Sequence, residues 1–527
     1  PGTDGVTFAS PVTIADGKTI TITTDTGHAT ADGKVQFDST ISGVETSGNT
    51  GTDESLVIDS GTGNVTITGN IGATATTAIE SLTINSTDSA SKDGDITLSG
   101  NIGATAEDGT ITPGTLGTVT IGNTATDALT LGGTVYNTNT ATYEAKTNAD
   151  SISLTGTSPT FTSSDDAITF TGGRVKLTDG TFTVNSNSGP ITIGDIKGTG
   201  ADNVTLNAGT ADSTDAKVTV GAIGAGNKIA IVSITGNDGV TLNGSITTED
   251  ASNAAVTVAS GSGTITLGTD ITIDTNVTNN DGDITLGSID ATTDHGQALT
   301  LDSGTGAVSI GVIGGTEQLD GLTVNTADGA SDSGNITITG IGGGTATYGV
   351  VGTVAVGNDA TNLLTLSGTS YDTDGVTTYE AKSGTDTIKI SSASAVEFIT
   401  NADNIRFKTG DILLDGGSST KITTGTGGAG DITIDADVDS EAATAENFQL
   451  ISGSGAIDVG GAMGAVVNLG TIDINSTDNG SGTTDGAGTI EIGAIGTTSA
   501  DGATGAVKIG NTETALLTLD GAVYNTD

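Results

Sequence analysis

The sequence predicts an all-β protein that folds as a parallel β-helix, or β-solenoid. Three observations lead to this prediction. Short strands of the form apolar-Thr-apolar recur along the whole chain, Gly, Asn and Asp turns separate them, and long imperfect repeats differ in length by a large block of residues.

The short strands are the commonest local unit, for example at 65–67, 96–98, 204–206, 284–286 and 432–434. Alternation with a period of two, in residues that are mostly β-branched, is typical of a strand with one buried face. No segment shows sustained helical periodicity and Thr and Gly are abundant, so we expect almost no helix.

The composition indicates how these strands pack. The 527 residues include 83 Gly but only 6 Tyr, 8 Phe and no Trp, which suits a thin aliphatic core. A propeller would carry an aromatic signature in each blade, and a sandwich would have longer strands. We therefore expect stacked coils of roughly 20–25 residues, about 4.8 Å apart, with a right-handed path.

Long repeats divide the chain into three modules. The motif Leu-Thr-Leu-x-Gly-x-x-Tyr ends at Tyr136, Tyr371 and Tyr524, which gives modules at 1–142, 143–378 and 379–527. The interval from Tyr136 to Tyr371 exceeds the interval from Tyr371 to Tyr524 by 82 residues. A solenoid absorbs such a difference by adding coils, about four of roughly 20 residues each. Both ends fall inside a module, so we expect a longer array or end-to-end stacking.

The charge excludes several partners. The chain has 15 Lys and Arg against 63 Asp and Glu, a net charge of −48, which repels nucleic acid. It has no apolar run long enough to span a membrane, and no Cys for disulfides or thiolate metal sites.

The strands, together with turns such as Gly-Asn-Ile-Gly at 69–72 and 100–103, resemble bacterial haemagglutinin-type and autotransporter-passenger β-helix adhesins. These are giant extracellular surface proteins built from β-strand repeats. The resemblance implies a secreted β-helix that acts as a surface fibre or adhesin shaft, with surface glycans as candidate partners. We do not expect the secretion domain or the translocator barrel of that family within these 527 residues.

Catalytic chemistry is sparse. His28 and His295 are the only histidines, both within Gly/Asp/Thr turns, and Arg174 and Arg406 are the only arginines. We therefore do not expect an enzyme. A polysaccharide lyase-like, carbohydrate-active β-helix would need Arg or Lys beside metal-binding Asp on one face, and it stays the alternative, together with a calcium- or glycan-binding adhesin module.

Calcium is the one metal that the sequence suggests, and no other cofactor is expected. Carboxylates at alternate turn positions could converge when coils stack, as a hard cation requires. Asp in turns also occurs for local hydrogen bonding alone. The candidate ligands are Asp93, Asp95, Asp281, Asp283, Asp435 and Asp437.

Self-association is the remaining hypothesis. Tyr136, Tyr371 and Tyr524 could be contact anchors, or they could cover a kink in the solenoid. Arg174, Arg406 and Lys408 lie in corresponding cationic zones of two modules and could dock onto acidic faces of neighbouring copies, or they could be local surface charge. The sequence thus predicts a structural fibre at the bacterial cell surface.

Overall fold

The structure is a computed structural model. It describes residues 5–25, 32–44, 54–74, 77–90, 92–105, 111–112, 117–147, 150–163, 165–200, 202–209, 215–227, 229–248, 255–276, 281–327, 333–343, 348–416, 419–425, 430–441, 445–476, 488–498 and 501–526. The chain divides into two compact units, Pro1–Thr264 and Ile265–Asp527.

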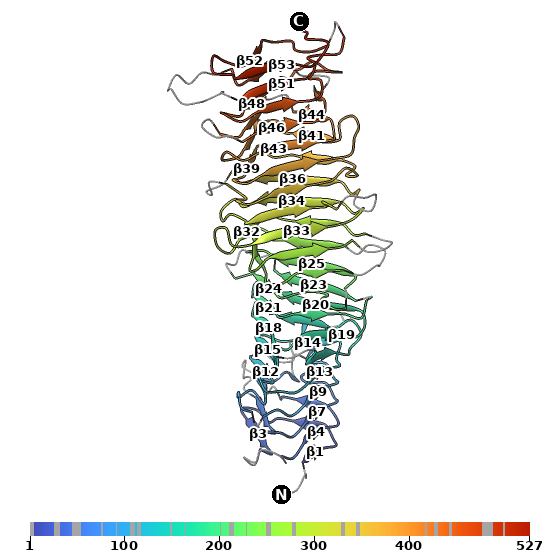
Figure 1. The fold of residues 1–527 in the computed structure, drawn as a ribbon. Coiled ribbons are helices and arrows are strands. Elements are labelled where there is room, and N and C mark those ends of the chain that lie inside the picture. Colours follow the sequence, from blue (N-terminus) through green and yellow to red (C-terminus); the bar gives the residue numbers. More distant parts are fainter. Residues whose placement is uncertain are drawn as a thin grey trace. The chain divides into compact units, whose positions relative to one another are not determined.

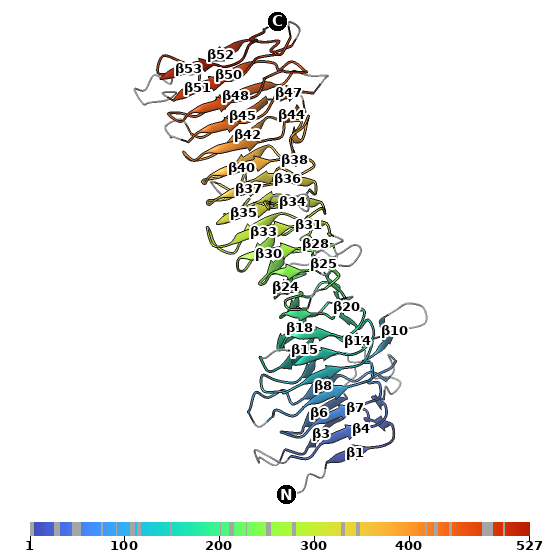
Figure 2. The same ribbon diagram turned by 45° about the vertical axis from the view of Figure 1, so that its right-hand side comes forward.

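Both units are parallel β-solenoids, as the sequence predicts (Figures 1 and 2). Each full coil contributes strands to three ladders, and each strand pairs in parallel with the equivalent strand of the next coil. We number the ladders of each unit first, second and third, in the order in which a coil passes through them.

In unit 1 the first ladder contains β1 (Val6–Phe8), β4 (Val35–Phe37), β7 (Val65–Ile67), β9 (Ile96–Leu98), β13 (Leu129–Leu131), β16 (Ile152–Leu154), β19 (Val175–Leu177), β22 (Ile196–Lys197) and β27 (Ile246–Thr247). The second contains β2 (Val12–Thr13), β5 (Ile41–Ser42), β14 (Val135–Asn137), β17 (Thr160–Ser163), β20 (Thr181–Ser186), β23 (Asn203–Ala208), β25 (Ile231–Gly236) and β28 (Val256–Ala259).

The third ladder of unit 1 contains β3 (Thr19–Thr23), β6 (Ser55–Asp59), β8 (Ser81–Ile84), β12 (Val119–Ile121), β15 (Ala141–Ala145), β18 (Ile168–Gly172), β21 (Ile191–Ile193), β24 (Val218–Val220) and β26 (Val240–Leu242). A short antiparallel pair leaves this pattern, formed by β10 (Ala104–Thr105) and β11 (Ile111–Thr112).

In unit 2 the first ladder contains β30 (Ile271–Asp274), β33 (Ala298–Asp302), β35 (Gly321–Val324), β37 (Val354–Val356), β40 (Thr377–Glu380), β43 (Ile405–Lys408), β46 (Ile432–Ile434), β49 (Ile457–Val459), β51 (Thr489–Ile492) and β53 (Leu516–Leu519). The second contains β31 (Ile284–Leu286), β34 (Val308–Ile313), β36 (Ile336–Ile341), β38 (Leu364–Leu366), β41 (Ile388–Ser391), β44 (Ile412–Asp415) and β47 (Val438–Ser440).

The third ladder of unit 2 contains β29 (Ile265–Leu267), β32 (Ile289–Ala291), β39 (Ser370–Asp372), β42 (Val396–Ile399), β45 (Ser419–Thr423), β48 (Asn447–Ile451), β50 (Ile472–Ile474) and β52 (Val507–Ile509). Between β32 and β39 this ladder runs through the C-terminal ends of β34 and β36.

The triplets fold as the alternation predicts. Val65 pairs with Val35 on one side and Ile96 on the other, and all three are fully buried, whereas Thr66 is only half-buried. Equivalent aliphatic side chains thus stack from coil to coil while the middle residue stays outside. The described residues contain no α-helix, which agrees with the prediction, and none of their segments is a helix that could cross a membrane.

Coil length is less uniform than the sequence predicts. In the first ladder of unit 1, Ile96 pairs with Leu129, so one coil spans the whole stretch between them, and the coils before it are similarly long. Later in the same ladder Val175 pairs with Ile196, which is a much shorter coil. The expected length of roughly 20–25 residues therefore holds for some coils only, because long coils recur in unit 2, where Leu322 pairs with Val354 and Ile457 with Ile490. The turns between ladders account for most of this variation, since the strands themselves have only two to six residues.

A buried Ser–Asn pair recurs in the three modules. Asn325 lies in the left-handed region (φ 44°), its Oδ1 accepts the N–H of Ser303 (2.8 Å) and its Nδ2 donates to the Ser303 hydroxyl (2.9 Å). The pairs Ser60–Asn85 and Ser452–Asn475 repeat these bonds. Since a buried N–H needs a partner, each Asn side chain completes the turn that follows the equivalent strand of the preceding coil.

Copies of the tyrosine motif do not keep their place around the coil. In unit 2, Tyr371 lies in the third ladder, between Ile341 and Phe398. Tyr524 lies in the second ladder, which it joins through Ile495. The local turn is nevertheless the same, because each phenol oxygen accepts the N–H of the glycine three residues earlier, Gly368 or Gly521. The interval between these copies is therefore not a whole number of coils.

We expect Asn325→Ala to lower the free energy of unfolding by about 3 kcal/mol, because it leaves the buried Ser303 N–H without a hydrogen-bond acceptor and places Ala in the left-handed region. Asn325→Gly, which removes only the second cost, should lose about 1 kcal/mol less. Urea unfolding midpoints measure both. Asn335→Ala, at an exposed turn, is the control and should stay within about 0.5 kcal/mol of wild type. Equal losses in all three variants would contradict the role of the pair.

Candidate functional site

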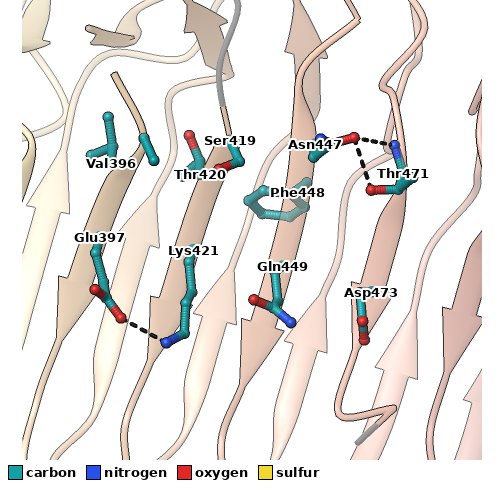
Figure 3. Close-up of a pocket in the computed structure, with 11 residues that line it drawn as sticks. Val396, Glu397, Ser419, Thr420, Lys421, Asn447, Phe448, Gln449, Thr471 and Asp473 are labelled. Carbon is teal, nitrogen blue, oxygen red and sulfur yellow. Dashed lines mark hydrogen bonds and ion pairs between the residues drawn. The ribbon is translucent and has the colours of Figure 1, made fainter. Parts of the chain in front are cut away.

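A shallow polar groove of about 280 Å³ lies on the third ladder of unit 2 (Figure 3). It crosses four successive coils, at strands β42, β45, β48 and β50. Its long direction therefore follows the stacking axis of the unit and not the strands.

One row of side chains runs along the groove. Glu397, Lys421, Gln449 and Asp473 are register partners in successive coils and project from the same side of their strands (Figure 3). The next residue in each strand is buried: Phe398, Ile422, Leu450 and Ile474 are 0–1% exposed. Strand alternation fixes the orientation of the row, because the aliphatic and aromatic partners occupy the core.

Charge within the row is partly compensated. The Lys421 ammonium lies 2.6 Å from Glu397 Oε1, and both side chains are about 40% exposed. Gln449 and Asp473 make no side-chain hydrogen bond with any described residue. The row therefore offers one ion pair, one amide and one carboxylate to solvent.

A second row closes the groove at one side. Asn447 Oδ1 accepts both the N–H and the hydroxyl of Thr471, each at 2.8 Å. Ser419 is the register partner of Asn447 in the preceding coil. These bonds tie the start of β48 to the residue that precedes β50 in the next coil, so the wall is formed before any ligand arrives.

The groove does not have the geometry of a glycoside hydrolase. Its carboxylates, Glu397 and Asp473, are separated by three coil steps, about 14 Å along the axis. Paired catalytic carboxylates stand roughly 5 to 9.5 Å apart. Glu397 is also held by Lys421. Of the two histidines, His28 lies outside the described residues and His295 lies in a turn after β32. The arrangement is suited to binding, and it assembles no acid–base pair.

The candidate calcium ligands are engaged in bonds between coils. Asp281 accepts from the N–H (2.8 Å) and hydroxyl (2.7 Å) of Thr305, and Asp283 from the N–H of Ala307 (2.8 Å). Asp437 accepts from the N–H of Ala462 (2.6 Å). Such carboxylates act as caps on the turn of the next coil.

The remaining candidates differ from one another. The Asp435 carboxylate accepts hydrogen bonds from Arg406 Nη2 (2.6 Å) and Nε (3.0 Å). Around Asp93 and Asp95 the bonds are made by the backbone, with Asp95 N–H donating to Asn64 Oδ1 (3.1 Å). Across the described ranges, no three His, Asp or Glu side chains gather as a metal site would require. Calcium binding stays a prediction of the sequence.

Two of the three tyrosines are core residues. Tyr136 and Tyr371 are 0–1% exposed, and each stacks on a phenylalanine of the next coil, Phe161 at 4.3 Å and Phe398 at 4.7 Å between ring centroids. Neither is available at the surface as a contact anchor, which corrects that hypothesis for both. Tyr524 is 37% exposed.

The cations of the docking hypothesis all have acidic partners within the chain. Arg174 lies 3.5 Å from Asp150. Arg406 binds Asp435, and Lys408 lies 2.8 Å from Glu380 Oε1. Their charge is therefore largely balanced by residues of neighbouring coils.

Sequence reasoning missed the groove, although a signal was present. In β42, β45, β48 and β50 the outward position between two inward residues is Glu, Lys, Gln and Asp, where most triplets have Thr. With Lys508 in the next strand, β52, five such departures occur in succession, and they mark a distinct surface. Their alignment could not be recognised without knowing that these strands are neighbours.

The chain matches no protein-family model, no curated protein and no solved structure.

We expect acid to stabilise unit 2. Burial, followed by repulsion from Asp437 and Asp386, raises the pKa of Asp439, and burial likewise raises the pKa of Asp411. The folded state then binds protons that the unfolded chain releases, so stability increases as pH falls from 7 toward the ordinary Asp value near 3.8 and decreases as pH rises. Melting temperature between pH 7 and pH 5 measures this.

Asp439→Asn should raise the melting temperature at pH 7 and weaken its pH dependence, because the amide oxygen can still accept the N–H groups of Val466 and Val467. Asp88→Asn is the control, since hydrogen bonds from Thr124 lower the pKa of Asp88 and removing its charge should bring no gain. A wild-type melting temperature that falls between pH 7 and pH 5 would refute the expectation.

Proposed function

We propose that the chain is an extracellular structural protein, a rigid β-solenoid shaft of a bacterial cell surface that assembles with copies of itself. The observation that carries the proposal is unbroken parallel pairing: β1 through β22 in unit 1, and β30 through β53 in unit 2. Each unit grows by adding coils along one direction, and stiffness comes from bonds between coils.

The location is inferred from the composition and the family resemblance. A Cys-free, Thr-, Gly- and Asp-rich chain with a net charge of −48 is typical of bacterial surface proteins, and its charge would keep a long shaft dispersed in water. The adhesin-like turns and triplets support the same assignment.

The mode of assembly follows from the ion pairs. Arg406 and Lys408 are each paired with an acid of their own chain, and Arg174 shares Asp150 with Lys197, so these zones leave little positive charge for an acidic neighbour. Association must instead overcome repulsion between acidic surfaces, and salt screens that repulsion.

We therefore expect assembly to increase with salt. Electron microscopy of the purified chain at roughly 10 mM and 150 mM NaCl should show rods that lengthen or bundle at the higher ionic strength, where the Debye length falls to about 8 Å. Sedimentation of the same samples gives the assembled fraction.

Arg406→Gln tests the alternative directly, with Lys34→Gln as a control of equal charge change. If cationic zones drive docking, Arg406→Gln alone weakens assembly and salt dissolves it. Isolated particles at both salt concentrations would reject self-association, and compact particles without an elongated axis would reject the shaft itself.

A further inference from the structure

We propose that the groove on β42, β45, β48 and β50 binds a neutral, linear polysaccharide that lies along the stacking axis, with one sugar residue on each coil. This inference concerns a binding site and does not depend on self-association.

The first argument is spacing. Glu397, Lys421, Gln449 and Asp473 present one polar group per coil, and successive coils are about 4.8 Å apart. That repeat is close to the length of one hexopyranose unit in an extended chain. A ligand with the same period can hydrogen-bond at every coil, whereas an extended peptide, which rises about 3.3 Å per residue, does not match this spacing.

The second argument is chemistry. The Gln449 amide can donate and accept, the Asp473 carboxylate can accept from two hydroxyls, and the Glu397–Lys421 pair offers both functions side by side. Vicinal hydroxyl groups are the ligands that use such mixed donors and acceptors. Asn447 and Thr471 already bond to each other and supply the wall.

The third argument is charge. Glu397 and Lys421 cancel, and Asp473 is followed in register by Lys508 of β52, so the row has no large charge of its own on a chain whose net charge is −48. A polyanionic glycan would be repelled, and no described arginine faces the groove to hold a carboxylate or sulfate. A neutral chain is the polysaccharide class that this surface admits.

The fourth argument is preorganisation. The buried neighbours Phe398, Ile422, Leu450 and Ile474 fix the backbone beneath the row. Little conformational entropy is lost when a ligand settles on such a surface. No exposed aromatic ring lines the groove, so each sugar contributes hydrogen bonds alone, and a polymer should bind measurably where a monosaccharide does not.

Affinity gel electrophoresis of the full chain tests the proposal. The probes are hydroxyethylcellulose, laminarin and dextran as neutral polymers, and polygalacturonate as the anionic one. We expect at least one neutral polymer to retard the wild-type chain, relative to a gel without polymer, and polygalacturonate to have no effect. Retardation by none of the neutral polymers would overturn the proposal, as would retardation by polygalacturonate alone.

Asp473→Ala and Gln449→Ala together should reduce the binding constant from that retardation at least tenfold. Asp458→Ala is the matched control. Asp458 is the middle residue of Ile-Asp-Val in β49, and Asp473 is the middle residue of Ile-Asp-Ile in β50, but β49 belongs to the first ladder and lies outside the groove. The control should bind like wild type. Unchanged binding in the double variant, or an equal loss in the control, would refute the site, provided that the melting temperatures of both match wild type. If the double variant unfolds, Gln449→Glu replaces it. This substitution keeps the side-chain volume, and we expect the same loss of binding.

Discussion

The structure depends on one constraint, which is that the inward residues of each coil must meet equivalent residues of the next coil. Parallel backbone bonds hold successive strands in register, and that register places Val35, Val65 and Ile96 in one continuous aliphatic row. Because the same bonds position both backbone and core, a coil of any length is tolerated if its strands return to the ladder. This explains why the long coils that lead to β13 and the short coil between β19 and β22 coexist in unit 1.

The acidic composition has a structural origin at the turns. Carboxylates of one coil accept N–H groups of the next, as Asp195 does from Ala222 (2.9 Å) and Asp431 from Ala456 (2.8 Å). These N–H groups lie outside the strands, where the ladders cannot satisfy them. Asp is therefore used repeatedly as a cap between coils, and much of the negative charge follows from closing turns.

The sequence was sufficient for the strands and the fold class, because alternation in a triplet such as 65–67 reports burial directly. It was insufficient for contacts between coils. Arg406 and Asp435 are far apart in the chain, and nothing in their spacing shows that they form an ion pair on adjacent coils. Likewise Tyr136 and Tyr371 look like surface markers as rare aromatics, although their rings belong to the core stacks. Because turn lengths vary, the number of residues between neighbours on adjacent coils is not constant, and it cannot be read from the sequence.

Core and surface are chemically independent in this architecture, and that independence lets a shaft carry a binding surface. The middle residue of a triplet does not enter the core, so replacing Thr by Gln449 or Asp473 leaves the packing of Leu450 and Ile474 intact. The tyrosine motif recurs on different ladders of unit 2, so its copies do not generate equivalent faces. A distinctive surface arises only where successive coils depart from Thr at the same outward position, and β42 to β50 form such a place.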